Sequence, residues 1–117
     1  MSALLPISPS VDRRIQSRKL IRVPAVLDIA GRAPLSVRTV ELSASGLGLS
    51  CPVNLAPGLM CTVSFRLLGP ASLTELVLPG QLTYSVLSQR DGGFRIGVQF
   101  KNLSTDNAKR LEACLTI

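Results

Sequence analysis

Apolar and polar residues alternate along much of this chain, and the alternation predicts β-strands. It is clearest over residues 35–42 and 94–100, where the period of two is that of a half-buried strand. Further runs have the length and the apolar or β-branched content of strands, at residues 23–29, 47–51, 60–68 and 73–87. Six or so strands at this short spacing indicate a small antiparallel barrel or sandwich.

Turn residues separate these runs. Gly31 ends the first run, Pro57-Gly58 precedes the run 60–68, and Asp91-Gly92-Gly93 is a β-hairpin signal. Pro79-Gly80 lies inside the run 73–87, where it predicts a bulge or an edge position.

Only the C-terminal end has a helical pattern. Residues 104–107 can cap a helix, and Ala108, Leu111 and Leu115 follow at helical spacing on one face. We expect this helix to cover one opening of the sheet or to pack against its wall. The predicted fold class is therefore all-β with one C-terminal helix.

The length of 117 residues supports a single domain with one core. Residues 1–12 are rich in Ser and Pro without a visible period, so we expect a disordered N-terminal tail there. Residues 13–22 form a basic arm, because five of the thirteen Lys and Arg lie in this stretch. Residues 23–117 form the folded part. The formal charge of +6 favours anionic partners, and an arm at the mouth of a folded domain can meet phosphate-rich ligands.

The residues that most enzymes need are scarce. The chain has no His, its seven Asp and Glu are scattered, and no phosphate-binding glycine loop occurs. Cys51, Cys61 and Cys114 form no CxxC pair, so we interpret them as core fillers rather than metal ligands. We expect a binding module, not an enzyme, without metal or other cofactor.

The expected location is the cytoplasm. An odd number of cysteines without a secretory signal peptide indicates a reducing compartment. The uncharged stretch 42–65 contains Gly, Pro and Asn at several positions, so it predicts strands with turns and no membrane insertion.

Two short segments have the chemistry of a nucleotide site. Arg18 and Arg22 lie four residues apart on the arm, and arginine donates bidentate hydrogen bonds to phosphate oxygens or to guanine O6 and N7. Glu41 ends the second predicted strand, where its carboxylate could accept hydrogen bonds from a guanine's N1–H and N2–H₂ edge. Ser43 offers a hydroxyl, and we expect Gly46 to turn the chain with a positive φ close to a ligand.

These residues resemble the PilZ domain family. Its hallmarks are R-x-x-x-R at the entrance of a six-stranded β-barrel and (D/N)-x-S-x-x-G at the end of the second strand. Arg18 and Arg22 match the first motif, and Ser43 and Gly46 match the second. The resemblance covers about residues 14–116, and the ending Gly-Val-Gln-Phe before a C-terminal helix is also similar to the family.

The resemblance implies a six-stranded antiparallel Greek-key barrel that binds cyclic di-GMP, a bacterial second messenger. Arg18 and Arg22 would engage phosphate and guanine, while Ser43 and Gly46 would shape the cradle. Binding would order the arm against the barrel and change the surface offered to an unidentified protein effector. The weaker candidates for contacts with the ligand are Arg13, Arg14, Lys19 and Ser45.

Glu41 departs from the family pattern, which has Asp or Asn at this position. Misfitted hydrogen bonds to a charged group forfeit about 1.5–3 kcal/mol, roughly a tenfold to hundredfold loss of affinity. An alternative function is therefore a degenerate PilZ-like module that binds protein only, for which the high apolar content also allows a homodimer.

A general nucleic-acid binder on a similar barrel is the third hypothesis. Single-strand binders need exposed aromatic residues for stacking, and this chain has only Tyr84 and three Phe. Phe94 and Phe100 share a strand face with Ile96 and Val98, which predicts a core position. We therefore expect no DNA or RNA partner and assign Tyr84 no function.

Overall fold

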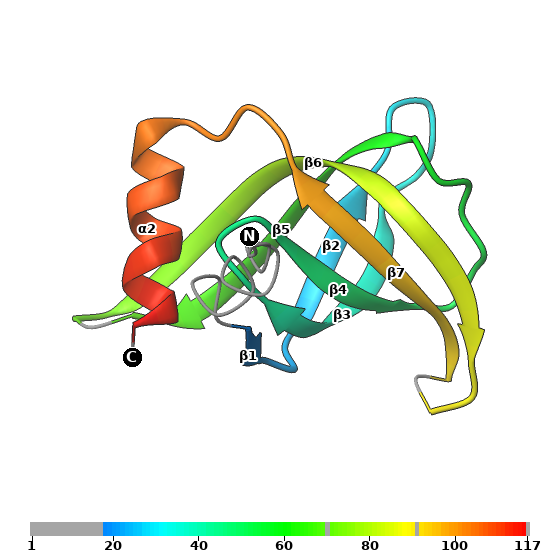
Figure 1. The fold of residues 1–117 in the computed structure, drawn as a ribbon, viewed down its shortest axis with the longest axis horizontal. Helices are drawn as coiled ribbons and strands as arrows, with labels where there is room; N and C mark the ends of the chain where they lie inside the picture. Colours follow the sequence, from blue (N-terminus) through cyan, green and yellow to red (C-terminus); the bar gives the residue numbers. More distant parts are fainter. Residues whose placement is uncertain (1–17, 70, 91, 117) are drawn as a thin grey trace, which may run out of the picture.

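The computed structural model describes residues 18–69, 71–90 and 92–116 of the chain (Figure 1). The expected tail 1–12 and the candidate residues Arg13 and Arg14 lie outside the described residues. The described residues form seven strands and one helix: β1 Lys19–Leu20, β2 Pro24–Asp28, β3 Leu35–Leu42, β4 Gly46–Cys51, β5 Met60–Leu68, β6 Leu73–Ser88, β7 Gly93–Phe100 and α2 Thr105–Leu115.

Six of these strands close into an antiparallel barrel. Their hydrogen-bonded order is β3-β2-β5-β6-β7-β4, and a pairing between β3 and β4 closes the ring. The short strand β1 pairs with the end of β3, on the same edge as β2. The predicted six-stranded barrel with a C-terminal helix is confirmed, and the sandwich is excluded. The boundaries predicted for the strands at residues 35–42 and 60–68 are the ones that the structure shows.

The alternation of the sequence becomes the inside and outside of this barrel. Every second residue of β5 is buried, from Cys61 to Leu67, and the intervening residues face outward. Leu27, Leu49 and Ile96 are fully buried from three other strands. Aliphatic side chains fill most of the core, as the low aromatic content predicted.

The strand β6 is long because it belongs to two pairings. Its first half pairs with β5 from Leu73 to Gln81, and its second half pairs with β7 from Gly80 onward. Pro79 therefore precedes the pairing with β7, where its missing N–H removes no bond of that ladder. The prediction of a bulge or an edge position at Pro79-Gly80 is wrong, because Gly80 pairs with Cys61 of β5 on one side and with Phe100 of β7 on the other. The bulge of β6 lies further along, between Leu82 and Tyr84.

The helix α2 lies beside the first half of β6 (Figure 1). Ser104 caps it by accepting a hydrogen bond from the backbone N–H of Asn107 at 3.0 Å, as predicted. Leu111 and Cys114 are its buried residues. Ala108 was expected on the same apolar face but is exposed, because the side of the helix toward β6 passes through Asn107, whose amide donates to the Val77 carbonyl at 3.0 Å.

Buried polar contacts fix the path from β1 into β2. Thr39, which is 1 % exposed, donates a hydrogen bond from its hydroxyl to the carbonyl of Ile21 and accepts one from the backbone N–H of Val23. On the other side of the arm, the Lys19 ammonium donates to the carbonyl of Cys114 at 3.3 Å. A cation there complements the C-terminal end of α2, whose last turn has no basic residue of its own.

No helix formed by the described residues is long and apolar enough to span a membrane. Cys51, Cys61 and Cys114 are free and buried, in agreement with their predicted role in the core. Burial raises the pKa of all three thiols, and that of Cys61 to about 11.

We expect the three thiols to react slowly with Ellman's reagent in the native protein at about pH 8, because thiolate is the reacting species and burial disfavours it. All three should react rapidly after unfolding in guanidinium chloride. The release of nitrothiobenzoate, followed by absorbance, measures both rates. Rapid reaction of three thiols in the folded protein would contradict the packing described here.

Candidate functional site

A row of four residues crosses the outer face of the barrel beside the arm. Glu41 of β3 lies opposite Gly48 of β4, Gly48 lies opposite Gly97 of β7, and Gly97 lies opposite Tyr84 of β6. The two glycines in the middle of the row have no side chain, whereas Glu41 and Tyr84 at its ends have long ones. The result is a hollow of about 320 Å³. We call it the glycine trough, with Gly48 and Gly97 as its floor and Arg18, Glu41, Thr83 and Tyr84 around it.

Both floor glycines are required by their neighbours. A methyl group at Gly97 would overlap the ring of Tyr84, so this ring lies directly against the β7 backbone. A methyl group at Gly48 would lie 3.0 Å from Nε of Arg95 and 3.4 Å from Cγ of Glu41. Glycine at these positions therefore lets an aromatic ring and a charged pair lie close to the sheet, as glycine inside strands often does.

A β-bulge stands beside each end of the row. In β3 the register shifts between Thr39 and Glu41, and in β6 it shifts between Leu82 and Tyr84. Each bulge inserts one residue, which changes the face on which the following side chains emerge. As a result Glu41 and Tyr84 both border the trough.

Glu41 holds two arginines at the trough. Its Oε2 lies 3.2 Å from Nη2 of Arg95 and 3.5 Å from Nη1 of Arg18. The Arg95 side chain is 26 % exposed and that of Arg18 is 70 % exposed, so the contact with Arg18 is far more open to solvent. Ion pairs as exposed as the second contribute only about 0–1 kcal/mol. Arg18 can therefore exchange Glu41 for another anion at small cost.

The turn from Ser43 to Gly46 is organised by the Ser43 hydroxyl. This oxygen accepts from the backbone N–H groups of Ser45 and Gly46 at 3.3 and 3.2 Å and lies 3.2 Å from the Gly46 carbonyl, to which it can donate. Ser43 is 9 % exposed, whereas Ser45 is exposed at the rim. The second motif therefore builds the end of the β3–β4 hairpin beside the trough.

Gly46 is required for a different reason from the one expected. The positive-φ glycines among the described residues are Gly31, Gly58 and Gly92, so the expectation of a positive φ at Gly46 is wrong. A methyl group at Gly46 would instead overlap the carbonyl oxygen of Val98. Glycine is needed because the backbones of β4 and β7 come close here.

The two arginines of the first motif lie differently. Arg18 borders the trough, whereas the exposed Arg22 is not among the residues that line it. Arg22 lies between Ile21 and Val23, whose backbones are both hydrogen-bonded to the Thr39 side chain. Lys19, a weaker candidate, contacts α2 and does not line the trough.

The structure thus brings Arg18, Glu41, Ser43, Ser45 and Gly46 to one hollow and leaves Arg22 outside its lining. Sequence reasoning missed Arg95, Gly48, Gly97 and Tyr84. The signal available for the glycines was their position inside predicted strands, which indicates close approach of another group. Arg95 and Tyr84 lie 54 and 43 residues from Glu41 in the chain, and only the register of the sheet brings them together.

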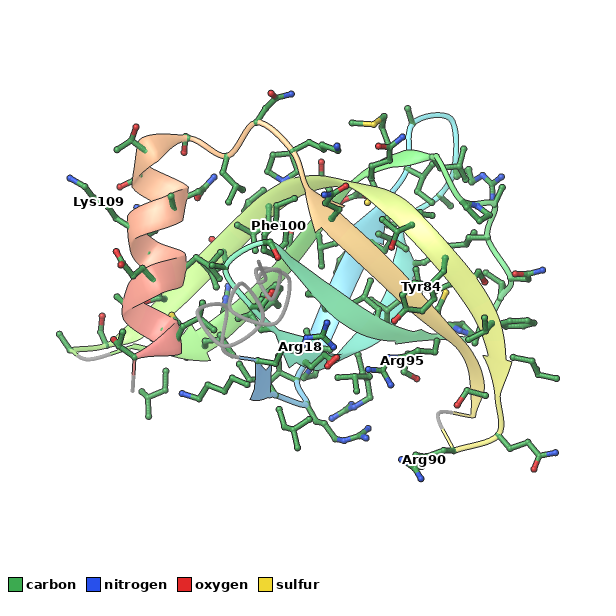
Figure 2. All side chains as sticks on the ribbon, in the orientation of Figure 1. Arg18, Tyr84, Arg90, Arg95, Phe100 and Lys109 are labelled. Atoms are coloured by element: carbon green, nitrogen blue, oxygen red, sulfur yellow. The ribbon has the colours of Figure 1, made fainter. Side chains whose placement is uncertain are left out.

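The chemistry of the trough suits a ligand with both anionic and planar parts. Figure 2 shows Arg18, which precedes β1, near Arg95 of β7 and Tyr84 of β6; Arg18 and Tyr84 line the trough, and Arg95 contacts Glu41 at its border. The arginines provide donors to anionic oxygens, and Tyr84 provides an aromatic surface 41 % exposed to solvent. Within the described part of the chain, no group of three or more His, Cys, Asp or Glu is placed to hold a metal ion.

The comparisons with solved structures agree with the barrel. The inhibitor of motility MotI/DgrA of Bacillus subtilis has a TM-score of 0.74 at 10 % identity, over 89 % of this chain and 50 % of that one. YcgR of Escherichia coli in complex with c-di-GMP has a TM-score of 0.65 at 20 % identity, over 89 % of this chain and 45 % of that one. This chain therefore spans about half the length of both proteins.

The PilZ domain of YcgR, solved with c-di-GMP, matches over almost its full length. The TM-score is 0.63 at 18 % identity, over 89 % of this chain and 90 % of that domain. At such identities these likenesses show the fold alone. No protein in the curated set matches the chain by sequence.

The family is shown by the sequence itself. The family model of the PilZ domain matches residues 12–116, which is nearly the whole chain. Together with the barrel, the bulged trough and the two motifs beside it, this match identifies the chain as a member of the PilZ domain family.

Proposed function

We propose that this protein is a receptor for cyclic di-GMP and binds it at the glycine trough. The observation that supports this most is the placing of Arg18, Glu41 and Tyr84 around a floor of two glycines. Membership of the PilZ family supports the choice of ligand, since the PilZ domain of YcgR was solved with c-di-GMP. The protein acts by binding and not by catalysis.

In this proposal the phosphate meets Arg18 and one guanine lies against Tyr84. The guanidinium of Arg18 donates two parallel hydrogen bonds to phosphate oxygens, which is its strongest mode of binding. The exposed side of the Tyr84 ring stacks on the base, and Gly97 allows that ring to lie close to the sheet. Arg22 engages the part of the dinucleotide that extends over the rim of the trough.

Glu41 has two opposite effects on the proposed binding of the ligand. Its carboxylate can accept hydrogen bonds from the N1–H and N2–H₂ edge of guanine, but in this structure it faces Arg18 and Arg95. The phosphate therefore has to replace Glu41 at Arg18 before it can bind. Because that ion pair is exposed and weak, the exchange lowers the affinity without preventing binding.

The arm is the part of the protein that would report binding. It is joined to α2 through Lys19 and to the trough through Arg18, so a ligand that draws Arg18 away from Glu41 also acts on the contact with the helix. We propose that binding orders the arm and that a separate protein recognises the changed surface. Three free buried cysteines fit a cytoplasmic location, where thiols stay reduced.

A second candidate function is a protein-binding module that takes no nucleotide. The observation in its favour is that Glu41 already contacts both Arg18 and Arg95. In that case the charged pair would be a structural link between the arm and β7. The experiments below separate the two functions, because only the first requires a response to nucleotide.

Isothermal titration calorimetry with cyclic di-GMP tests the proposal directly, with GTP as the control ligand. We expect saturable binding that GTP does not reproduce. Arg18→Ala should weaken it by about tenfold to a hundredfold, because charge-assisted hydrogen bonds to phosphate are lost. Arg22→Ala should weaken it less, since Arg22 lies outside the trough.

Arg32→Ala is the matched control, because Arg32 is exposed in the turn between β2 and β3 and does not line the trough. It should bind like the original protein. A flat titration of the folded original protein would exclude the receptor and favour the protein-binding module. Equal losses in Arg18→Ala and Arg32→Ala would show that the charge acts without a specific site.

Glu41→Asp should tighten the binding of cyclic di-GMP by about tenfold, because the shorter carboxylate restores the family's geometry and reaches Arg18 less well. Calorimetry of the two proteins at the same salt concentration measures the difference. Weaker binding by the Asp variant would mean that the contacts of Glu41 help the ligand.

Tyr84→Ala should weaken binding by about tenfold, as expected for the loss of one base-stacking partner, while Tyr84→Phe should retain it. The phenylalanine variant keeps the ring against Gly97 and removes only the hydroxyl. If both variants lose affinity equally, the hydroxyl and not the ring makes the contact.

A further inference from the structure

The outer face of the barrel has a second and larger hollow, of about 830 Å³. It crosses β4, β3, β2, β5 and β6, which are neighbours in that order. We call it the arginine groove and define it by Pro24, Val26, Ser36, Arg38, Ser64 and Arg66, all of which line it.

Two arginines stand in one row across this groove. Arg38 of β3 lies opposite Pro24 of β2, and the register of Ala25 with Phe65 places Pro24 opposite Arg66 of β5. Neighbouring strands are about 4.8 Å apart, so the Cα atoms of the two arginines are about 9.6 Å apart. Pro24 lies between the two arginines, and its compact ring leaves space between their side chains.

Small residues form the next row. Val26 of β2 lies between Ser36 of β3 and Ser64 of β5, and its side chain is 40 % exposed. Two hydroxyls thus flank an apolar strip and can hydrogen-bond the backbone of a ligand. The larger neighbours Phe65 and Val37 point into the core and do not fill the groove.

The charge of the groove is positive over β3 and β5. Arg38 and Arg66 are exposed, and neither makes an ion pair with another described residue. Glu75 lies opposite Arg66 on β6 and ends the positive stretch on that side. At the other end, the row passes from Arg38 through Ser50 to Arg95.

We propose that the arginine groove binds an extended acidic segment of another protein, with two acidic residues three positions apart. In a polyproline II helix, residues three apart lie on the same side about 9.3 Å from each other, close to the spacing of the two arginines. One carboxylate then meets Arg38, the other meets Arg66, and the residues between them cover Pro24 and Val26. Acidic motifs are commonly recognised by clustered arginines in this way.

The positions of the acidic residues favour a segment of a different protein. The seven acidic residues of this chain are Asp12, Asp28, Glu41, Glu75, Asp91, Asp106 and Glu112, and no two of them are three apart. Residues 1–117, in this chain or in a second copy, therefore provide no pair of carboxylates at this spacing. Nucleic acid is disfavoured because the groove has no exposed aromatic residue for stacking. The proposal does not depend on nucleotide binding at the trough.

The test uses the full chain and the fluorescein-labelled peptide amide Ala-Glu-Pro-Pro-Glu-Ala, followed by fluorescence polarisation. We expect saturable binding that weakens as salt is added. Arg38→Ala and Arg66→Ala should each lower the affinity about fivefold, the upper end for an exposed ion pair. The double variant should lose about twenty-five-fold, because sites this far apart are nearly additive.

Two controls separate the groove from general charge. Arg32→Ala removes an exposed arginine outside the groove and should leave the affinity unchanged. The peptide with Gln in place of both Glu should not bind, and this needs no change in the protein. Equal losses in the Arg32 and Arg38 variants would overturn the proposal. Binding of anionic vesicles or single-stranded DNA, with no binding of the acidic peptide, would also overturn it.

Discussion

The close approach of side chains to the backbone at Gly48 and Gly97 is the constraint on which the site depends. Any Cβ at Gly97 would displace the Tyr84 ring, and one at Gly48 would press on the pair formed by Arg95 and Glu41. These two glycines therefore determine how near the walls of the trough come to the sheet. The bulges in β3 and β6 complete the arrangement, because they turn Glu41 and Tyr84 toward the same hollow.

Arg95 connects this site to the rest of the outer face. Its guanidinium contacts Glu41 at the trough, while its backbone lies opposite Ser50, a residue that lines the arginine groove. A ligand that changes the partners of Glu41 thus acts on a residue that stands between the two hollows. The free energy involved is modest, since each contact is partly exposed, and contacts of this strength can be rearranged by a ligand.

The sequence was a good guide to the fold because alternation has a direct physical cause. Residues that alternate in polarity alternate between core and solvent, so the boundaries of β3 and β5 followed from the pattern. The helical spacing of Ala108 with Leu111 and Leu115 wrongly predicted that Ala108 faces the core. In the structure, α2 packs on β6 through the side that carries Asn107 and Leu111. The sequence of the helix alone does not determine which of its sides packs against β6.

The site was less predictable, and for a related reason. Arg18, Glu41, Ser43 and Gly46 come from two short motifs that could be recognised in the chain. Arg95 and Tyr84 join them only through the register of β4, β7 and β6, which the sequence does not specify locally. The role of Gly46 was misjudged because a glycine in a turn suggests a positive φ, whereas here a neighbouring carbonyl requires it.

The most direct test of the central claim is a nuclear magnetic resonance titration of ¹⁵N-labelled protein with cyclic di-GMP. If the ligand binds at the trough, the largest amide shifts should be those of Gly48 and Gly97, followed by residues of the Ser43–Gly46 turn. Shifts concentrated on other strands, or no shifts for a protein that remains folded, would contradict the assignment of the trough as a nucleotide site.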